Sequence, residues 1–215
     1  DKGCVVGEVV WCPMLTAQYV MTAYMTGQEI PEERKERFLK FFQVWQIEDG
    51  SFGLHAESPG YVFVTTLSYL ALRLLGVEEE DERCVQAKEW IEAHGGVLAI
   101  PSWGKAWLAM MNLYSWDGVA AILPELWLQP DASPFHPRRM YCHTRLIYLG
   151  LSYLFGVKFQ IPEDDFVRQM RKELFNEPFE SIDFKAHRFH LASCDVFEAP
   201  HPILKKVYEM CAVYD

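Results

Sequence analysis

Short apolar stretches along the chain have the spacing of amphipathic helices. Pro13 and Pro31 each open such a stretch, and proline is favoured in the first turn of a helix. The first stretch ends near Gly27, a residue typical of helix ends. In the second, four large aromatic side chains share one face, and these are Phe38, Phe41, Phe42 and Trp45. The two stretches predict two consecutive helices.

The same signals predict a series of further helices. They are expected at 64–75, 81–94, 105–114 with Ser102 as its N-cap, 138–155, from Pro162 onward, 181–190 and 202–214. No run of alternating residues with hairpin turns appears in the sequence, so the chain is predicted to be all-α. Helices that follow one another through short loops predict either a solenoid or a closed α/α barrel.

Length, composition and charge limit the number of domains and the kinds of partner to be expected. With 215 residues, 50% of them hydrophobic, the chain is predicted to form a single domain over 1–215. The net charge of −10 is spread over many short segments, which argues against nucleic acid and does not favour an anionic membrane face. The aromatic content of 14%, with seven Trp, favours an aromatic-lined cavity. Because the first residue is Asp1 rather than Met, we expect the chain to be a portion of a longer polypeptide.

Two patterns could indicate a metal site, and each has a simpler interpretation. His187, His190 and Cys194 have a spacing of about two helical turns, but no fourth ligand is evident. The pair Asp164-Asp165 resembles the start of an aspartate-rich magnesium motif, but Arg168 stands where the later carboxylate is required. We therefore expect structural or solvated residues at the first pattern, a helix N-terminus at the second, and no metal.

The strongest signals are two groups of motifs. The first is 46–53, in which Gln46 and Gly50 precede Phe52. The second is a series at 101–143, made of Pro101-Ser102-Trp103-Gly104-Lys105, Tyr114-Ser115-Trp116, Pro124-Glu125-Leu126-Trp127-Leu128, His136-Pro137 and Met140-Tyr141-Cys142-His143. In order and spacing these motifs resemble the oxidosqualene cyclases, a family that includes lanosterol and cycloartenol synthases. The likeness runs from about residue 30 to the end and implies the N-terminal α/α barrel (toroid) of a triterpene cyclase.

The resemblance implies roles for individual residues. Trp103, Tyr141 and His143 are expected to line the cyclisation cavity, with Tyr141 where the family usually has Trp. The narrow entry to that cavity is expected to be formed by Thr144, Ile147 and Tyr148. The segment with Gln46, Gly50 and Phe52 resembles the structural QW repeat, with Phe52 in place of the usual Trp.

The resemblance also implies an activity that this chain holds only in part. Such enzymes fold (3S)-2,3-oxidosqualene, protonate its epoxide and guide the cation to a sterol precursor such as lanosterol or cycloartenol. Their proton donor is an Asp in an Asp-Cys-Thr-Ala-Glu motif, which is absent from these residues. We therefore expect no catalytic residue here, an inactive fragment, and a remaining C-terminal part of the cyclase as partner. No cofactor is implied, and the whole enzyme is expected to associate peripherally (monotopically) with an intracellular membrane, the endoplasmic reticulum if eukaryotic.

Two other interpretations stay open. The aromatic side chains could simply fill a helical core, together with a buried, hydrogen-bonded His143, and these aromatics are Trp103, Trp107, Trp116 and Trp127. The chain could also be a non-catalytic α/α-barrel module that binds a lipid or a partner subunit. A protein prenyltransferase β-subunit shares the barrel type but is disfavoured by the lack of a convincing zinc triad.

Overall fold

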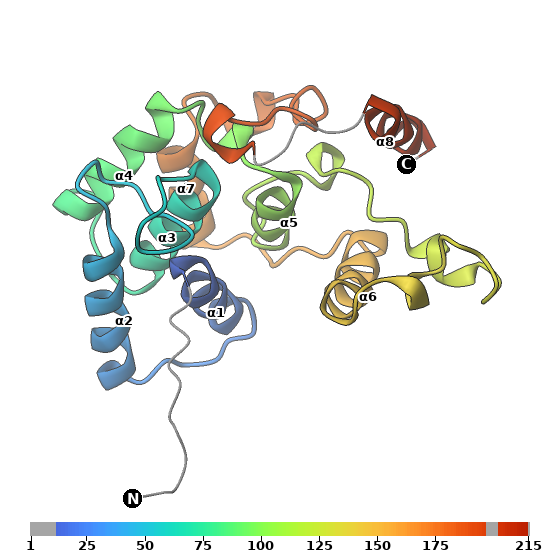
Figure 1. Cartoon of the computed structure of the whole chain (residues 1–215). Helices are drawn as coiled ribbons and strands as arrows, with labels where there is room; N and C mark the ends of the chain where they lie inside the picture. The colour runs from blue at the N-terminus through green and yellow to red at the C-terminus, as the bar shows by residue number, and fades with distance from the viewer. Residues whose placement is uncertain (1–11, 197–201, 215) are drawn as a thin grey trace, which may run out of the picture. The chain divides into compact units, whose positions relative to one another are not determined.

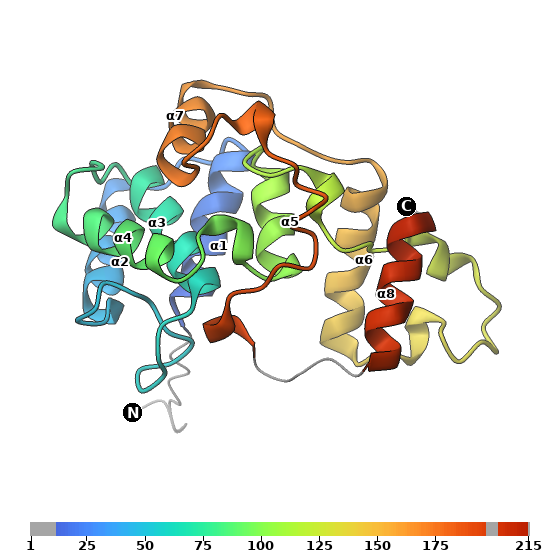
Figure 2. The ribbon, with the colours of Figure 1, turned by 90° about the horizontal axis from the view of Figure 1, so that it is seen from above.

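A computed structural model describes residues 12–196 and 202–214, and in these ranges the chain is helical (Figures 1 and 2). No strand occurs in the described ranges, which contain only two isolated β-bridges, so the all-α prediction is confirmed. The helices are α1 (Pro13–Met25), α2 (Glu32–Trp45), α3 (Val62–Leu74), α4 (Glu82–Ala93), α5 (Ser102–Met110), α6 (Cys142–Gly156), α7 (Asp165–Leu174) and α8 (Pro202–Tyr214). Short 3-10 turns join several of them, among them η2 (Trp116–Gly118), η3 (Pro124–Leu128) and η6 (Ser193–Asp195).

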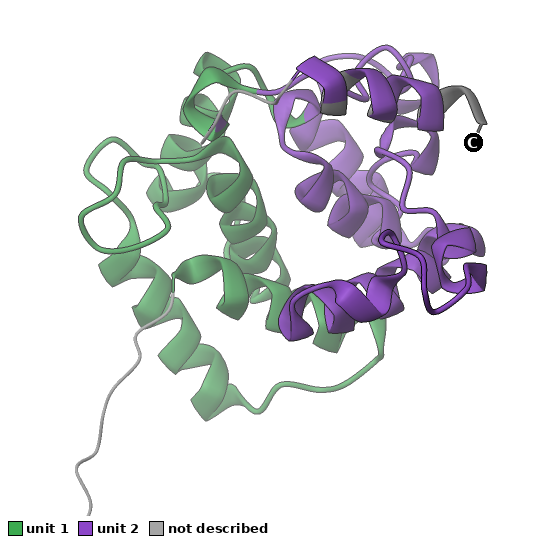
Figure 3. Ribbon diagram, turned by 45° about the vertical axis from the view of Figure 1, so that its right-hand side comes forward, with its two compact units in different colours: residues 1–97, 192–195 green, residues 98–191, 196–215 purple. Residues whose placement is uncertain are grey.

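The chain divides into two compact units, coloured separately in Figure 3. Unit 1 comprises residues 1–97 and 192–195, and unit 2 comprises residues 98–191 and 196–215. Each unit is described by itself below. The assignment of 1–215 to a single domain stays a prediction.

Helix α3 is the central element of unit 1. Every residue from Val62 to Leu72 is buried, because α1 and α4 both pack against this helix. A helix that is apolar on all sides is expected where neighbours surround it. The core of unit 1 is therefore built around α3.

The N-terminus of α3 is capped by a side chain from far along the chain. Tyr61 is the N-cap residue but its side chain makes no capping hydrogen bond. Instead the carboxylate of Asp195, in η6, accepts the N–H of Val62 at 2.8 Å and the N–H of Phe63 at 2.9 Å. Burial raises the pKa of Asp195, and the two backbone hydrogen bonds partly oppose that rise. This contact fixes the segment 192–195 in unit 1.

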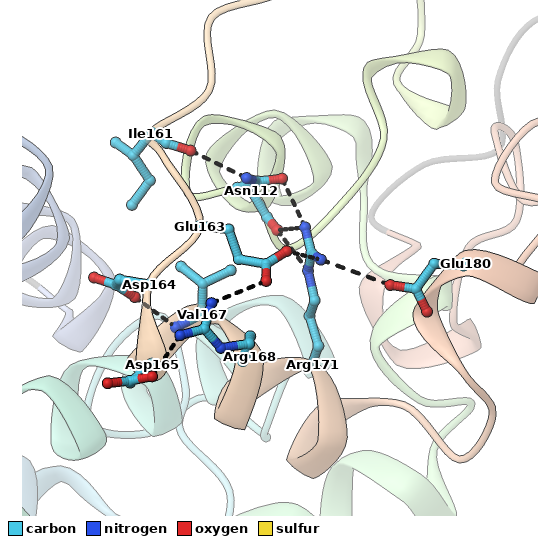
Figure 4. Close-up of polar contacts among 9 residues, drawn as sticks. All are labelled: Asn112, Ile161, Glu163, Asp164, Asp165, Val167, Arg168, Arg171 and Glu180. Carbon is cyan, nitrogen blue, oxygen red and sulfur yellow. Dashed lines mark hydrogen bonds and ion pairs between the residues drawn. The ribbon is translucent and has the colours of Figure 1, made fainter.

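In unit 2 the C-terminal end of α5 is joined to α7 by a polar network (Figure 4). Asn112 follows α5 with φ +61, a left-handed conformation that Asn tolerates better than most residues. The Arg171 guanidinium donates to the backbone oxygen of Asn112 at 2.9 Å and to its side-chain oxygen at 2.8 Å. Arg171 also pairs with Glu163 at 2.7 Å and lies over the Phe179 ring. The network fixes where α5 ends.

Three of the sequence-predicted boundaries are wrong. Ser102 is the first residue of α5 and Pro101 is its N-cap, because the backbone at Pro101 is extended. Helix α5 ends at Met110 rather than at 114, because Asn112, with its positive φ, turns the chain. Helix α6 begins at Cys142 rather than 138, since a separate 3-10 turn occupies Pro137–Arg139.

The predicted helix at 181–190 is also wrong, because that segment forms turns. The Asp183 carboxylate accepts the N–H groups of Lys185 and Ala186, an arrangement that competes with helix formation. Three carbonyl oxygens of the segment accept hydrogen bonds from the Lys105 ammonium, and that of His187 also accepts the N–H of His190 three residues on, as in a turn. The remaining predicted helices are found within about two residues of their expected bounds, except that α7 begins at Asp165, three residues after Pro162.

Candidate functional site

Two of the predicted cavity residues lie together at the N-terminus of α6. The rings of Tyr141 and His143 stack with their centroids 5.2 Å apart and their planes at 26°. Tyr141 is the N-cap residue of α6, with extended backbone, so its ring precedes the helix. Both side chains are exposed, Tyr141 to 70%. The α6 N-terminus therefore presents a pair of stacked π-systems on the surface of this chain.

The third predicted cavity residue, Trp103, lies on a different helix. It is the second residue of α5 and is half-buried. Its neighbours in α5 from Gly104 to Ala106 are buried, and these consecutive positions span about 200° of the helix, so α5 is enclosed in unit 2 over much of its circumference. An indole in this position is partly available to a ligand.

The predicted entry residues follow along α6, where they differ in burial. Thr144 and Ile147 are exposed, whereas Tyr148 is half-buried and its hydroxyl donates to the backbone oxygen of Leu123. Burial, and then the negative charge of Glu125, raise the pKa of Tyr148 to about 12. Tyr148 is thus a neutral, oriented phenol over the physiological range.

Trp127, for which the sequence indicated no role in the cavity, lies beside Tyr148. Its ring lies 6.0 Å from that of Tyr148 and 6.1 Å from that of His136, measured between centroids. Its indole N–H donates to the hydroxyl of Ser152 at 3.2 Å, which ties η3 to α6. The motif at Pro124–Leu128 was the sequence signal that could have found it.

The alternative in which these residues fill a core holds for one of them. Trp116 is buried, and its indole N–H donates to the backbone oxygen of Phe159 at 2.9 Å. The indoles of Trp103, Trp107 and Trp127 are only partly buried, and His143 is exposed. His143 is exposed in this chain, so the burial expected in that alternative is not found here, although its Nδ1 lies 3.3 Å from the Cys142 thiol.

The loop with Gln46, Gly50 and Phe52 links three helices of unit 1. Gln46 is the C-cap residue of α2, and its side-chain amide donates to the backbone oxygens of Gly50 and Arg83, each at 2.9 Å. Phe52 is fully buried, packs edge-on against Phe42, and donates its N–H to the Thr65 hydroxyl. The loop therefore connects the end of α2 to α3 and α4.

Gly50 is required by the geometry of that loop. Its φ is +88, and an added Cβ would lie 2.7 Å from the Cβ of Gln86 and 2.8 Å from the backbone of that residue. Next to it, the Asp49 carboxylate accepts the indole N–H of Trp90 at 3.0 Å. Burial acts to raise the pKa of Asp49, but the hydrogen bonds from Ser51 and Trp90 outweigh it, and the pKa falls below its ordinary value.

Neither metal pattern has the geometry that its interpretation required. The Nδ1 atoms of His187 and His190 lie 3.4 Å apart, but the segment is not helical, and the Cys194 thiol contacts the Asp195 carboxylate instead. Across the described residues no group of three or more His, Cys, Asp or Glu side chains could hold a metal ion. Asp164 is the N-cap of α7 and accepts the N–H of Val167 at 2.8 Å, which confirms its interpretation as a helix N-terminus.

Of the helices within 12–196 and 202–214, none combines the length and the apolar character that crossing a bilayer requires.

Comparison with known protein families identifies the family of this chain. Residues 1–213 match the family described as the squalene-hopene cyclase N-terminal domain. The chain belongs to this family. The match begins at residue 1, so the likeness extends further toward the N-terminus than the motifs indicated.

Several individual relatives are named as lanosterol, cycloartenol or protostadienol synthases. Lanosterol synthase of Homo sapiens is 38% identical over 196 residues, which are 91% of this chain and 27% of the relative. Cycloartenol synthase of Dictyostelium discoideum is 37% identical over 83% of this chain and 26% of its own length. Protostadienol synthase A of Arthroderma gypseum is 31% identical over 94% of the chain. The resemblance to oxidosqualene cyclases is confirmed, and the chain spans about a quarter of the length of the relatives it matches.

Proposed function

We propose that this chain is part of an oxidosqualene cyclase that converts (3S)-2,3-oxidosqualene into a sterol precursor such as lanosterol or cycloartenol. The observation that carries the proposal is the 38% identity to human lanosterol synthase over 91% of the chain. The motifs at 101–143, which carry the proposed cavity residues, support it further. The reaction is an isomerisation, so substrate and product have the same atoms and no cofactor is needed.

The proposed role of the aromatic residues is to stabilise positive charge as it develops. A carbocation is attracted to the face of a ring, and this attraction is stronger in the transition state than in the neutral substrate. Trp103 and Tyr141 are proposed to offer such faces, and His143, stacked on Tyr141, to help hold the late cation. Thr144, Ile147 and Tyr148 are proposed to form the entry. The proton that opens the epoxide is proposed to come from an Asp outside these 215 residues.

An apolar stripe on α6 supports the proposal that further polypeptide completes the cavity. Four exposed side chains at helical spacing form this stripe, namely Leu146, Leu149, Tyr153 and Val157. Exposed apolar side chains gathered on one face of a helix, when they form a large patch, usually mark an interaction site. The relatives are nearly four times as long as the matched region, so the rest of the enzyme is the partner we propose for the α6 stripe.

Peripheral, monotopic association with an intracellular membrane is part of the same proposal, at the endoplasmic reticulum if the source is eukaryotic. The support is chemical, because an apolar substrate is collected most easily from a lipid leaflet.

The test is complementation in Saccharomyces cerevisiae lacking its own lanosterol synthase. The complete reading frame that contains this sequence is expressed, and triterpene products are identified by gas chromatography and mass spectrometry. We expect a cyclised product from the complete frame and none from residues 1–215 alone. A stop codon directly after Asp215, or a complete frame without product, would contradict the proposal and favour the lipid- or subunit-binding module.

A further inference from the structure

Lys105 places a charged group inside unit 2. Its side chain has no exposed surface, and burial lowers its pKa to about 8. The ammonium donates to three backbone oxygens, those of His187 at 2.5 Å, Arg188 at 3.3 Å and His190 at 3.0 Å. The three N–H donors of a lysine are thus matched by three acceptors, all from one turn.

The turn that receives Lys105 is itself fixed to another element of unit 2. The guanidinium of Arg188 donates twice to the backbone oxygen of Asp117 in η2, at 3.0 and 2.7 Å. Earlier in the segment, the Phe184 ring packs edge-on against the buried ring of Tyr114, with centroids 4.5 Å apart. Because the turn is held at these points, Lys105 links α5 to a fixed support.

Trp103 and Lys105 lie on opposite sides of α5. They are two positions apart, and on an α-helix this corresponds to a rotation of about 200°. Lys105 therefore anchors the side of the helix that faces away from Trp103. A shift of α5 relative to its support would move the indole by a similar amount.

We propose that Lys105 is a positioning residue for the cyclisation cavity, which holds α5 against the 187–190 turn and thereby sets the position of the Trp103 indole. This rests on the proposed function. A ring face stabilises a cation only near contact distance, so a displaced indole favours some cyclisation steps over others. The expected consequence is a change in products as well as in rate.

The experiment uses three variants of the complete cyclase. Lys105→Met keeps much of the side-chain volume but removes all donors. Lys105→Arg keeps the charge but replaces the single nitrogen that donates to three oxygens by a larger, planar guanidinium fork. Lys185→Met is the matched control, because Lys185 belongs to the same segment but is exposed, with only a long contact of 3.9 Å to Asp117. Product ratios, kcat and KM are measured with oxidosqualene, and thermal unfolding reports folding.

We expect Lys105→Met to raise the share of incompletely cyclised products and to lower kcat on the order of tenfold to a hundredfold, with a small change in KM. Lys105→Arg should show the same change in products to a smaller degree, and Lys185→Met should match the unchanged enzyme. If Lys105→Met does not fold, the product ratio and kcat of Lys105→Arg test the proposal.

Unchanged products and kcat in a folded Lys105 variant, with an active parent enzyme, would overturn this inference alone. A parent enzyme without cyclase activity would overturn the proposed function and this inference with it.

Discussion

At the scale of single residues, Tyr141 is the proposed cavity residue whose ring type bears most directly on chemistry. Its ring stacks on His143 and is exposed in this chain, so it is available to a ligand. Compared with an indole, the phenol provides a π-face with a weaker attraction for cations.

Exchanging the phenol for an indole tests this difference. In the complete cyclase, Tyr141→Trp should leave kcat within a few-fold and shift the product ratio, whereas Tyr141→Leu should lower kcat by roughly tenfold, since about 1–2 kcal/mol of cation stabilisation is lost. Product analysis with oxidosqualene provides the measurement. Equal product ratios in all three proteins would show that this ring does not face the substrate.

The buried charge of Lys105 predicts an unusual dependence of stability on pH. Its pKa is about 8 in the folded chain and 10.5 ordinarily, so between these values the unfolded chain binds more protons. Stability then rises with pH across that window, by up to about 3 kcal/mol. Below pH 8 both states are charged and the contribution is constant.

Denaturation in urea at several pH values across the window measures this rise, and Lys105→Met, which has no such group, provides the reference. The tyrosines with raised pKa are present in both proteins, so their effect cancels in the difference. A difference in stability that does not change with pH would contradict a lowered pKa at Lys105.

At the scale of secondary-structure elements, the capping of α3 and α7 offers a contrast between distant and local caps. Asp195→Ala leaves the N–H groups of Val62 and Phe63 without their acceptors in a buried setting, which should cost about 2–4 kcal/mol. Asp164→Ala removes a local, exposed cap and should cost about 1 kcal/mol. Urea denaturation gives both costs, and hydrogen exchange at Val62 and Phe63 should accelerate only in the first variant. Equal costs would mean that Asp195 contributes no more than an ordinary cap.

The elements show where sequence reasoning succeeds and where it stops. Helices α1, α2, α4, α7 and α8 have local signals, such as Pro13 in the first turn and Asp164 at a cap, and these signals survive in the fold. The segment 181–190 has the apolar spacing of a helix but forms turns. Its carbonyl oxygens accept hydrogen bonds from the ammonium of Lys105, which is about 82 residues away in sequence. The Asp195 cap, 133 residues from its partner, leaves no local signal at all.

In the candidate site, too, some features could be predicted from the sequence and others could not. The proximity of Tyr141 and His143 follows from their positions in the sequence, and the roles proposed for them rest on the motifs that resemble the family. The exposure of α6 and the support of α5 by Lys105 depend on tertiary packing, so no pattern in the sequence could have indicated them.

At the scale of the whole molecule, a substitution in the α6 stripe should act differently in residues 1–215 alone and in the complete enzyme. Its side chains are well exposed here, Leu146 to 67% and Tyr153 to 68%. If the rest of the cyclase covers the stripe, a charge placed on it is harmless in residues 1–215 alone and is buried in the complete enzyme. Burying an unpaired charge costs several kcal/mol.

Tyr153→Glu should therefore reduce self-association of residues 1–215, as measured by sedimentation, because the apolar stripe is interrupted. In the complete cyclase the same change should lower the unfolding temperature and the yield of folded enzyme. Val44→Glu is the control, since Val44 is 72% exposed on α2 in unit 1 and should tolerate a charge in both proteins. If Tyr153→Glu were tolerated in the complete enzyme as well as Val44→Glu is, the stripe would remain exposed there, and the membrane surface would become the better candidate for its partner.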